Sequence, residues 1–351
     1  MTSSGSGAEP GASHPSGSST SKVTIYEVAR RAGVSIATVS HVLNRPERVA
    51  AATRTKVLEA VDHFDFVPKA VAVSRARQGV GRIGVIAPFT AYGSYHPRLL
   101  GLFDGLAASA LELAVFDCRA PIGAPSPTLE SLPMTGRLDG LIVMGLPVSD
   151  EVVERTMRRG LPTVLVDTTH PALDRVLVDD VAGGRLIGEH LVARGDRRIA
   201  FVHELPEVVL TQTAGELRMQ GCGDALVATS AADATIRHIP VANSLAGGRA
   251  AAAEIRGWDE RPDCIVAHHD TLAAGVWQGL TSAGWQLPAD VGLIGYDGTD
   301  LADALGITTV RQPFHRTGME AADLLLSRLD GYAGPPRTVL LQPAFVPGAT
   351  S

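Results

Sequence analysis

The sequence lacks the features that mark several large classes of protein. Its 351 residues include only three cysteines, Cys118, Cys222 and Cys264, whose spacing fits neither a disulfide framework nor a metal site. No stretch approaches the roughly 18 uncharged apolar residues of a membrane span. The first residues contain no basic segment followed by an apolar one, so no secretory signal is predicted. We therefore expect a cytoplasmic protein that lies outside the membrane.

Motifs of the common enzyme classes are also missing. The chain has no G-x-S-x-G elbow, phosphate-binding loop or H-E-x-x-H helix, and GGRLIG lacks dinucleotide-binding spacing. His268, His269 and Asp270 are consecutive, but neighbouring residues on a strand point to opposite faces, which argues against one shared metal site. The sequence therefore predicts neither an enzyme nor a bound metal or cofactor.

Charge is distributed unevenly along the chain. Residues 1–21 are mostly Ser, Gly, Ala and Pro with almost nothing to bury, so we expect a disordered tail there. Residues 22–78 hold ten Lys and Arg against five Asp and Glu, whereas residues 79–351 hold 21 basic and 31 acidic residues. A small basic unit joined to a large acidic one is typical of a protein that binds a polyanion through one end.

The basic unit carries signals for three short helices. Thr24 followed by Glu27 predicts a capping box at the start of the first helix. Gly33 predicts a tight turn, after which Ser35 can cap a second helix with apolar residues at helical spacing. A third helix is predicted over about residues 52–64, so this unit is a miniature three-helix bundle.

The rest of the chain alternates short aliphatic runs with longer helical patterns. Runs such as RIGVIAPF, LDGLIVMG, RRIAFVH and PDCIVAHHD look like buried parallel strands. About eleven strands are too many for one small sheet. The predicted fold is therefore an all-α head followed by an α/β core of two doubly wound parallel-sheet subdomains that face a cleft.

The run VTIYEVARRAGVSIATVSHVLNRPERVAAATRTKVLEAVDHFDFVP resembles the DNA-binding head of the lactose/galactose repressor (LacI/GalR) family. Later segments, among them GRLIGEHLVARGDRRIAFV, HHDTLAAGV, GLIGYDGTD and ITTVRQPFHRTG, resemble landmarks of that family's regulatory core. The resemblance covers the chain from about residue 22 to its end. It implies a homodimer with a helix-turn-helix head, a hinge helix and a core similar to periplasmic sugar-binding proteins.

The head offers residue types that suit contact with DNA. Thr24 and Ser35 stand at helix starts, where hydroxyls and free amides can bind phosphate oxygens. The second helix opens with an Ile-Ala pair, which reads only apolar features such as a thymine methyl, where the best-known family member has polar residues. The expected DNA contacts in the head are Thr24, Ser35, Ile36, Ala37, Thr38, Ser40, His41, Asn44 and Arg45.

Residues 69–79 occupy the position of the family's hinge helix, which pairs with its dimer mate against the minor groove. Lys69, Ala72 and Arg75 are the contacts expected there, and Arg75 stands where the family has a leucine that wedges between base pairs. An arginine could instead enter a narrowed, A/T-rich minor groove and follow its negative potential. A flexible linker with incidental charge is the alternative interpretation of this segment.

The resemblance also implies an effector site between the two core subdomains. Carboxylates and a guanidinium supply bidentate hydrogen bonds to vicinal hydroxyls, and an aromatic ring covers a sugar's apolar face, so a carbohydrate is favoured. Asn243 and Gly257 stand where the lactose repressor has an aromatic residue and an amide. The expected effector contacts are Phe89, Tyr92, Tyr95, Asp167, Arg218, Asp270 and Phe314.

These expectations define a division of the chain. The predicted segments are a tail at 1–21, the helix-turn-helix domain at 22–68, the hinge and linker at 69–79 and the core at 80–351. Within the core, one subdomain is expected to combine 80–180 with 310–330, and the other 181–309 with 331–351.

The predicted function is a sequence-specific transcriptional regulator, a repressor whose affinity for a pseudo-palindromic operator is controlled by a sugar or sugar derivative. Ligand binding would shift the two core subdomains and so loosen or tighten the hinge helices on DNA. Two alternatives stay open. One is a two-lobed solute-binding protein of a sugar transporter, which would have a signal peptide and no helix-turn-helix. The other is a regulator of the same class with a non-sugar corepressor.

Overall fold

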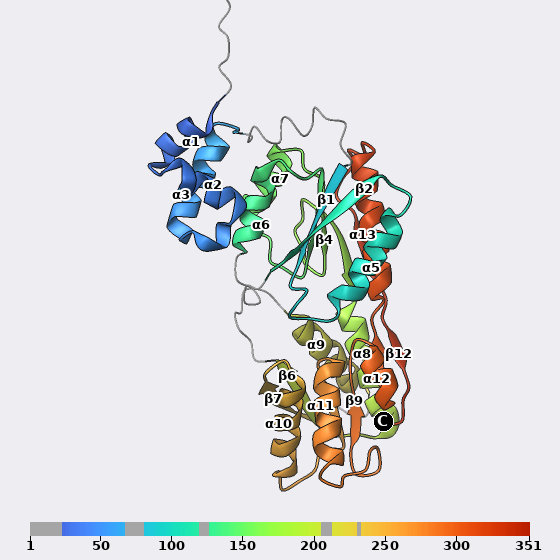
Figure 1. Ribbon diagram of the computed structural model, residues 1–351. Coiled ribbons are helices and arrows are strands. Elements are labelled where there is room, and N and C mark those ends of the chain that lie inside the picture. The colour runs from blue at the N-terminus through green and yellow to red at the C-terminus, as the bar shows by residue number, and fades with distance from the viewer. Residues whose placement is uncertain (1–22, 67–80, 119–125, 205–212, 230–232) are drawn as a thin grey trace, which may run out of the picture.

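The computed structural model describes residues 23–66, 81–118, 126–204, 213–229 and 233–351 (Figure 1). The expectations for the tail at 1–21 and for Lys69, Ala72 and Arg75 lie outside these ranges. Among the helices within them, none is long and apolar enough to cross a bilayer.

The head is a bundle of three α-helices, of which the first two begin at the caps that the local sequence signals predict. The Glu27 carboxylate accepts a hydrogen bond from the Thr24 amide at 2.8 Å, and the Ser35 hydroxyl accepts one from the Thr38 amide at 3.1 Å, as predicted. Gly33 ends the first helix in the left-handed region, at φ +66°, where glycine has no steric penalty. The elements are α1 (Ile25–Ala32), α2 (Ile36–Asn44), the 3-10 turn η1 (Pro46–Arg48) and α3 (Ala51–His63).

The first core subdomain is built on a six-stranded sheet with strand order β11-β5-β4-β3-β1-β2, all pairs being parallel. Alternate strand residues pack on opposite faces. Helices α5 and α13 cover one face, and α6, η2 and α7 lie on the other (Figure 1). The strands are β1 (Gly81–Ala87), β2 (Leu111–Asp117), β3 (Gly140–Met144), β4 (Thr163–Val166), β5 (Asp174–Val178) and β11 (Thr338–Leu341). The helices are α5 (Tyr95–Leu106), α6 (Pro127–Ser131), η2 (Leu132–Thr135), α7 (Asp150–Arg158) and α13 (Phe314–Leu329).

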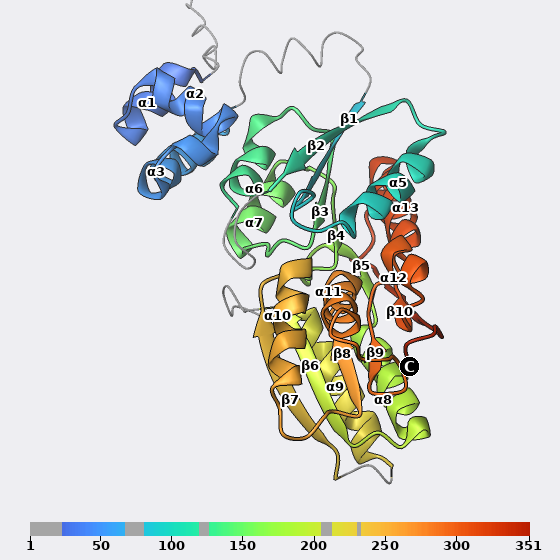
Figure 2. The same cartoon turned by 60° about the horizontal axis from the view of Figure 1, so that its bottom comes forward.

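The second core subdomain has a four-stranded parallel sheet with strand order β7-β6-β8-β9. Helices α8 and α9 pack on one face, and α10, α11 and α12 on the other (Figure 2). The strands are β6 (Arg198–Glu204), β7 (Thr235–Val241), β8 (Cys264–Ala267) and β9 (Gly292–Ile294), with β10 (Thr309–Arg311) and β12 (Ala344–Val346) as a separate antiparallel pair. The helices are α8 (Asp180–Arg194), α9 (Ala214–Val227), α10 (Leu245–Arg256), α11 (Asp270–Thr281) and α12 (Asp300–Leu305). The structure thus has the predicted fold class.

Two short segments lie in the subdomain opposite to the one expected. Strand β11 belongs to the first sheet, because it pairs in parallel with β5 and not with the second sheet. Strand β10 lies with the second subdomain, since Ile294 bridges to Thr308 and Asp297 to Arg311. The chain crosses between the subdomains three times, as the sequence predicted, but the last two crossings lie after β10 and after β11. The division at 310–330 and 331–351 is wrong for these two strands.

Candidate functional sites in the head and between the core subdomains

The head presents the start of α2 to solvent. Ser35, Ile36, Ala37 and His41 are exposed, with 39% of the Ile36 surface accessible, although isoleucine is a residue type that is usually buried. The apolar positions of the same helix, Val39, Val42 and Leu43, face inward and hold it in the bundle. The residues at the start of α2 that the sequence predicts to contact DNA therefore lie together on one solvent-exposed edge of the head.

The remaining expected DNA contacts of the head lie beside this edge. Thr24 is half-buried and is held in its capping box. Asn44 is exposed and donates through Nδ2 to the Ser40 carbonyl at 2.7 Å and to the Ser40 hydroxyl at 3.2 Å. Arg45 is exposed at the end of α2. This arrangement of hydroxyls, an amide and a guanidinium suits phosphate oxygens.

A buried ion pair lies in the first subdomain where it faces the second, at the junction that we call the cleft. Arg98, on the first turn of α5, hydrogen-bonds to the Asp167 carboxylate, and its side chain is 4% exposed. Its guanidinium lies 4.2 Å from the centre of the Phe314 ring and 5.3 Å from that of Tyr95. Its Nε is buried and has no hydrogen-bond partner within the described residues, so it is an unsatisfied donor.

Asp167 has an uncommon, left-handed backbone conformation. It follows β4 at the carboxyl edge of the sheet and has φ +53°, which is rare for a residue other than glycine. Burial raises the pKa of its carboxyl, and the neighbouring Arg98 only partly opposes that effect. Backbone strain of this kind concentrates at functional sites.

A second buried ion pair lies on the other side. Arg218 of α9 donates through Nε to Asp180 Oδ1 at 2.8 Å and through Nη1 to the His268 carbonyl at 2.8 Å. Its guanidinium stacks 3.7 Å from the centre of the Tyr296 ring. Burial lowers the pKa of Arg218, but Asp180, Tyr296 and Asp297 together outweigh this effect, so the pKa lies above its usual value. The guanidinium is therefore a permanent cation in a buried position.

Glycines on two helices bring this second pair into place. Helices α8 and α9 pack closely because Gly184 meets the backbone of Arg218, and Gly221 meets the backbone of Val181. A side chain at either glycine would collide with backbone atoms of the opposite helix. The close approach sets the distance between Asp180 at the start of α8 and Arg218 on α9.

Tyr92 connects the two subdomains across the cleft. The Tyr92 hydroxyl, from the loop after β1, donates to Glu204 Oε2 at 3.0 Å at the end of β6. His269 Nδ1 accepts from the Leu272 amide at 3.3 Å, so its proton is on Nε2, which donates to Glu204 Oε1 at 3.1 Å. Burial and then Glu204 raise the pKa of Tyr92, which keeps its hydroxyl a donor.

Asp270 has its hydrogen bonds within the second subdomain. Its carboxylate is buried and accepts from the Thr299 amide at 2.7 Å, the Thr299 hydroxyl at 2.9 Å and the Thr309 hydroxyl at 2.7 Å. Burial, followed by the nearby Asp297, raises the pKa of Asp270 to about 6. In this arrangement the carboxylate fixes the loops after β9 and before β10.

The expected effector residues thus form two groups. Tyr95, Asp167 and Phe314 surround Arg98, and the Phe89 ring meets Tyr95 edge-on with centroids 6.3 Å apart. Arg218 lies in the second subdomain, where it pairs with Asp180. Tyr92 of the first subdomain hydrogen-bonds to Glu204 of the second, and Asp270 hydrogen-bonds to Thr309 within the second.

The sequence analysis did not name several residues of this cleft. Asp297 has φ +110°, accepts from Gln312 Nε2 at 2.7 Å and has a pKa raised by burial. Its place between a buried strand and Gly298 was a usable signal. Arg98 and Glu204 had none, because an arginine on a helix and a glutamate after a strand are common on surfaces. The other unnamed cleft residues are Asp180, His269 and Tyr296.

Gly257 does not lie in the cleft. It follows α10 at the far end of the second subdomain, whereas Asn243, just before α10, hydrogen-bonds to Tyr92. Of the two positions at which the sequence departs from the lactose repressor's pocket, only Asn243 is therefore in the site.

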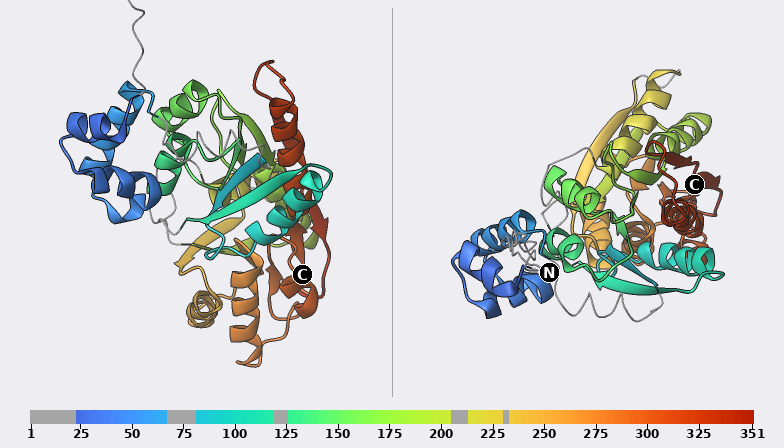
Figure 3. Two further views of the ribbon diagram at one scale, coloured as in Figure 1. Left: turned by 45° about the horizontal axis from the view of Figure 1, so that its top comes forward. Right: turned by 90° about the horizontal axis from the view of Figure 1, so that it is seen from above.

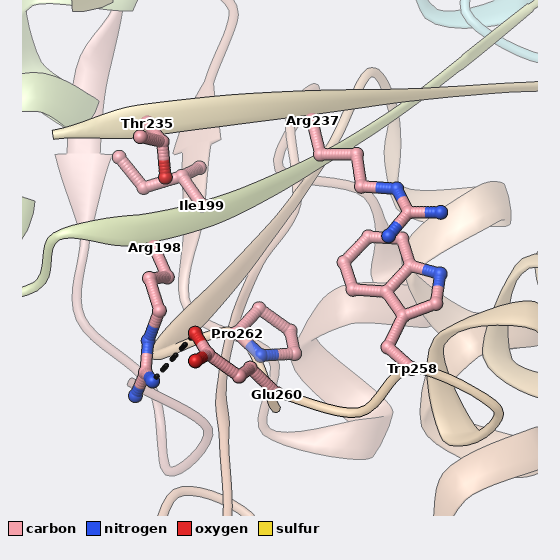
Figure 4. Close-up of a pocket in the computed structure, with 7 residues that line it drawn as sticks. All are labelled: Arg198, Ile199, Thr235, Arg237, Trp258, Glu260 and Pro262. Carbon is pink, nitrogen blue, oxygen red and sulfur yellow. Dashed lines mark ion pairs between the residues drawn. The ribbon is translucent and has the colours of Figure 1, made fainter.

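A shallow hollow of about 180 Å³ lies at this far end (Figure 4). The guanidinium of Arg237 stacks 3.9 Å from the Trp258 ring, and Arg198 pairs with Glu260 at 3.6 Å. Arg198 begins β6, whereas Glu204 ends it at the cleft, which separates the two places by roughly 20 Å of extended strand. The hollow is therefore distinct from the cleft. No group of three or more metal-ligating side chains occurs in the part of the chain that the structure describes.

Comparison with protein families gives two matches. Residues 24–69 match the model described as bacterial regulatory proteins, lacI family, and residues 189–351 match that of a periplasmic binding protein-like domain. An HTH-type transcriptional repressor PurR of Vibrio vulnificus is 29% identical over 331 residues, which are 92% of this chain and 97% of that repressor. The ribose operon repressor of Escherichia coli is 29% identical over 313 residues, 87% of this chain and 93% of that protein.

Solved structures are similar over the same regions. A LacI family transcriptional regulator from Enterococcus faecium with bound ribose has a TM-score of 0.67 at 27% identity, over 77% of this chain and 98% of that one. The lac repressor dimer bound to operator and an anti-inducer has a TM-score of 0.64 at 25% identity, over 93% and 98%. The match to the operator-bound dimer includes the head as well as the core.

Proposed function

The chain belongs to the LacI family of bacterial regulatory proteins, and from that membership we propose that it is a cytoplasmic repressor that binds an operator through its head and a sugar or sugar derivative through its cleft. The observation that carries the ligand class is the pair of buried Arg–Asp bridges, each backed by aromatic rings, on opposite sides of the cleft.

This chemistry favours a polyhydroxylated ligand. A guanidinium and a carboxylate that already pair with each other present a donor and an acceptor side by side, which matches two neighbouring hydroxyls. The buried Phe314 and Tyr296 rings stack on the two guanidinium groups and hold them in place. The unsatisfied Arg98 Nε supplies a further donor. The ribose-bound neighbour supports the same class.

The proposed regulation is a population shift between two subdomain arrangements. A ligand that contacts Arg98 on one side and Arg218 on the other would bind most tightly when the subdomains hold it from both sides. The Tyr92–Glu204 hydrogen bond spans this gap. We propose that residues 69–79 are the hinge that reports the change to DNA. Exposed Leu100, Phe103 and Met319 on α5 and α13 supply an apolar surface for a homodimer.

The test combines DNA selection with ligand titration. The full chain is incubated with fragmented genomic DNA of its source, bound fragments are sequenced, and the affinity for the enriched site is measured by fluorescence anisotropy. A panel of pentoses, hexoses and disaccharides is then titrated by calorimetry. We expect one pseudo-palindromic site and one sugar that changes operator affinity at least fivefold. A chain that selects no DNA site, or responds only to non-sugars, contradicts the proposal.

A further inference from the structure

The head is packed against the first core subdomain of its own chain. Met134 of η2 has no exposed surface and belongs to the hydrophobic cluster of the head, among Val57, Leu58 and Val61. Arg54 of the head donates to Glu130 of α6 at 2.7 Å, and its side chain is only 10% exposed. A shared apolar cluster and a half-buried ion pair define a packed interface.

A group of core arginines binds the acidic end of α3. Arg155 and Arg158 of α7 both pair with Asp62 at 3.1 Å. Arg159 pairs with Asp65 at 3.1 Å and donates to the Phe66 carbonyl at 3.2 Å. We call Glu130, Met134, Arg137, Arg155, Arg158 and Arg159 the docking surface. It neutralises the acidic side chains at the end of α3.

The docking surface also engages a residue of the DNA-reading side. Arg137 Nη2 donates to Asn44 Oδ1 at 2.6 Å, while Asn44 Nδ2 is bonded to Ser40. The Asn44 amide, an expected phosphate contact, is thus already occupied at both ends. Arg137 binds the amide oxygen and an operator phosphate would accept from Nδ2, so the docked core lies directly against a side chain that is expected to contact DNA.

The docked head lies on the side of the subdomain opposite to α5 and α13. Helices α6 and α7, which the head contacts, cover one face of the first sheet, and α5 and α13 cover the other (Figure 3). In a dimer joined through α5 and α13, docked heads would sit on the two outer sides. Helix-turn-helix dimers need their heads about one DNA turn, roughly 34 Å, apart. A whole subdomain from each chain would stand between docked heads.

We propose that the docking surface is an autoinhibitory contact, which holds the head away from the dimer axis until operator binding or a ligand-driven change releases it. This inference rests on the proposed function, because it assumes an operator and a dimer. Breaking the contact should therefore increase operator affinity.

The test uses charge reversal on the core side, so that no DNA-contacting residue is altered. Arg155→Glu with Arg158→Glu places two carboxylates against Asp62. We expect operator affinity to rise about fivefold or more, a typical coupling between two sites. Added negative charge alone would weaken DNA binding, so the expected gain runs against the simple electrostatic effect. Adding Asp62→Lys should restore the contact and return affinity to that of the natural chain.

Two controls separate docking from charge. Arg249→Glu with Arg256→Glu makes the same charge change on α10, far from the head, and should not raise affinity. Met134→Gln disturbs the docking surface without a charge change and should raise affinity in the same direction as the reversal. If the reversal variant binds operator no more tightly than the α10 control, autoinhibition is overturned.

Small-angle X-ray scattering without DNA distinguishes failure of this inference from failure of the proposed function. Release of the head should increase the radius of gyration in the reversal variant and not in the α10 control. An unchanged profile overturns the docking itself. If the natural chain selects no operator and the reversal variant still shows the larger radius of gyration, the proposed function is contradicted and the docking contact is retained.

Discussion

Arg218 and Arg237 offer a matched comparison for the ligand cleft, since both guanidinium groups stack on an aromatic ring in the second subdomain, at 3.7 and 3.9 Å. Only Arg218 faces the cleft, and it also neutralises Asp180. Arg218→Met should reduce sugar affinity by about 10- to 100-fold, because it removes a charged hydrogen-bond donor worth roughly 1.5–3 kcal/mol. Calorimetry checks this. Arg237→Met should leave affinity unchanged, and equal losses in both variants would place the ligand elsewhere.

Asp174 predicts a pH dependence of stability. Its fully buried carboxylate pairs with Arg328 at 2.7 Å and Arg337 at 3.1 Å. Burial opposes ionisation, but the hydrogen bonds from Arg328 and Arg337 lower the pKa of Asp174 to about 2, below an unfolded value near 3.9. The carboxylate therefore stabilises the fold above about pH 4, and this contribution is lost as pH falls toward 2.

We expect Asp174→Asn to lower the free energy of unfolding by about 1–2 kcal/mol at pH 7 and to have a smaller effect near pH 3. Urea unfolding at both pH values measures this. Asp303→Asn, which removes an exposed partner of Arg311, should cost little at either pH. A loss for Asp174→Asn that does not depend on pH would show that packing, and not charge, sets its role.

At the scale of elements, the close packing of α8 and α9 positions half of the cleft. Gly221→Ala would press a methyl group against the Val181 backbone, so the helices must separate and Arg218 must shift. We expect a lower melting temperature, with about 1–3 kcal/mol lost to overpacking, together with weaker ligand binding. Calorimetry on unfolding and on ligand titration measures both effects.

Gly223, on the same helix, has open space around its Cβ position. Gly223→Ala should therefore stabilise α9 by up to about 1 kcal/mol through helix propensity alone, and ligand affinity should stay unchanged. The opposite signs of the two Gly→Ala changes test whether close approach of the backbones is what places Arg218. If both variants were stabilised, the two helices would tolerate separation.

At the scale of the whole molecule, the head and the core should be separable in function. A fragment of residues 80–351 keeps both cleft ion pairs, and we expect it to bind sugar while losing specific operator binding. In the full chain, operator affinity should fall steeply with salt, because each neutralised phosphate releases counterions. Anisotropy titrations at several salt concentrations measure the slope. Specific operator binding by the fragment, or an operator affinity that does not depend on salt, would contradict the proposal that the basic head binds the operator.

The sequence by itself determined the parts that depend on neighbouring residues. The capping box of Thr24 and Glu27, the Gly33 turn and the Ser35 cap appear as predicted, because their partners lie within a few positions along the chain. The alternation of apolar runs and helical patterns likewise predicted the α/β core. Short strands with weak patterns, such as β5 and β12, were missed, since only their sheet neighbours make them strands.

The tertiary structure alone decided which distant residues meet. It placed β11 in the first sheet, through pairing with β5 more than 150 residues earlier. It brought Arg98 to Asp167, Tyr92 to Glu204, and the head to α6 and α7. No local pattern specifies such pairs, because the neighbours of an arginine along the chain do not show whether its side chain is exposed or buried. Their partners are chosen by how sheets and helices pack, and packing is a property of the folded chain as a whole.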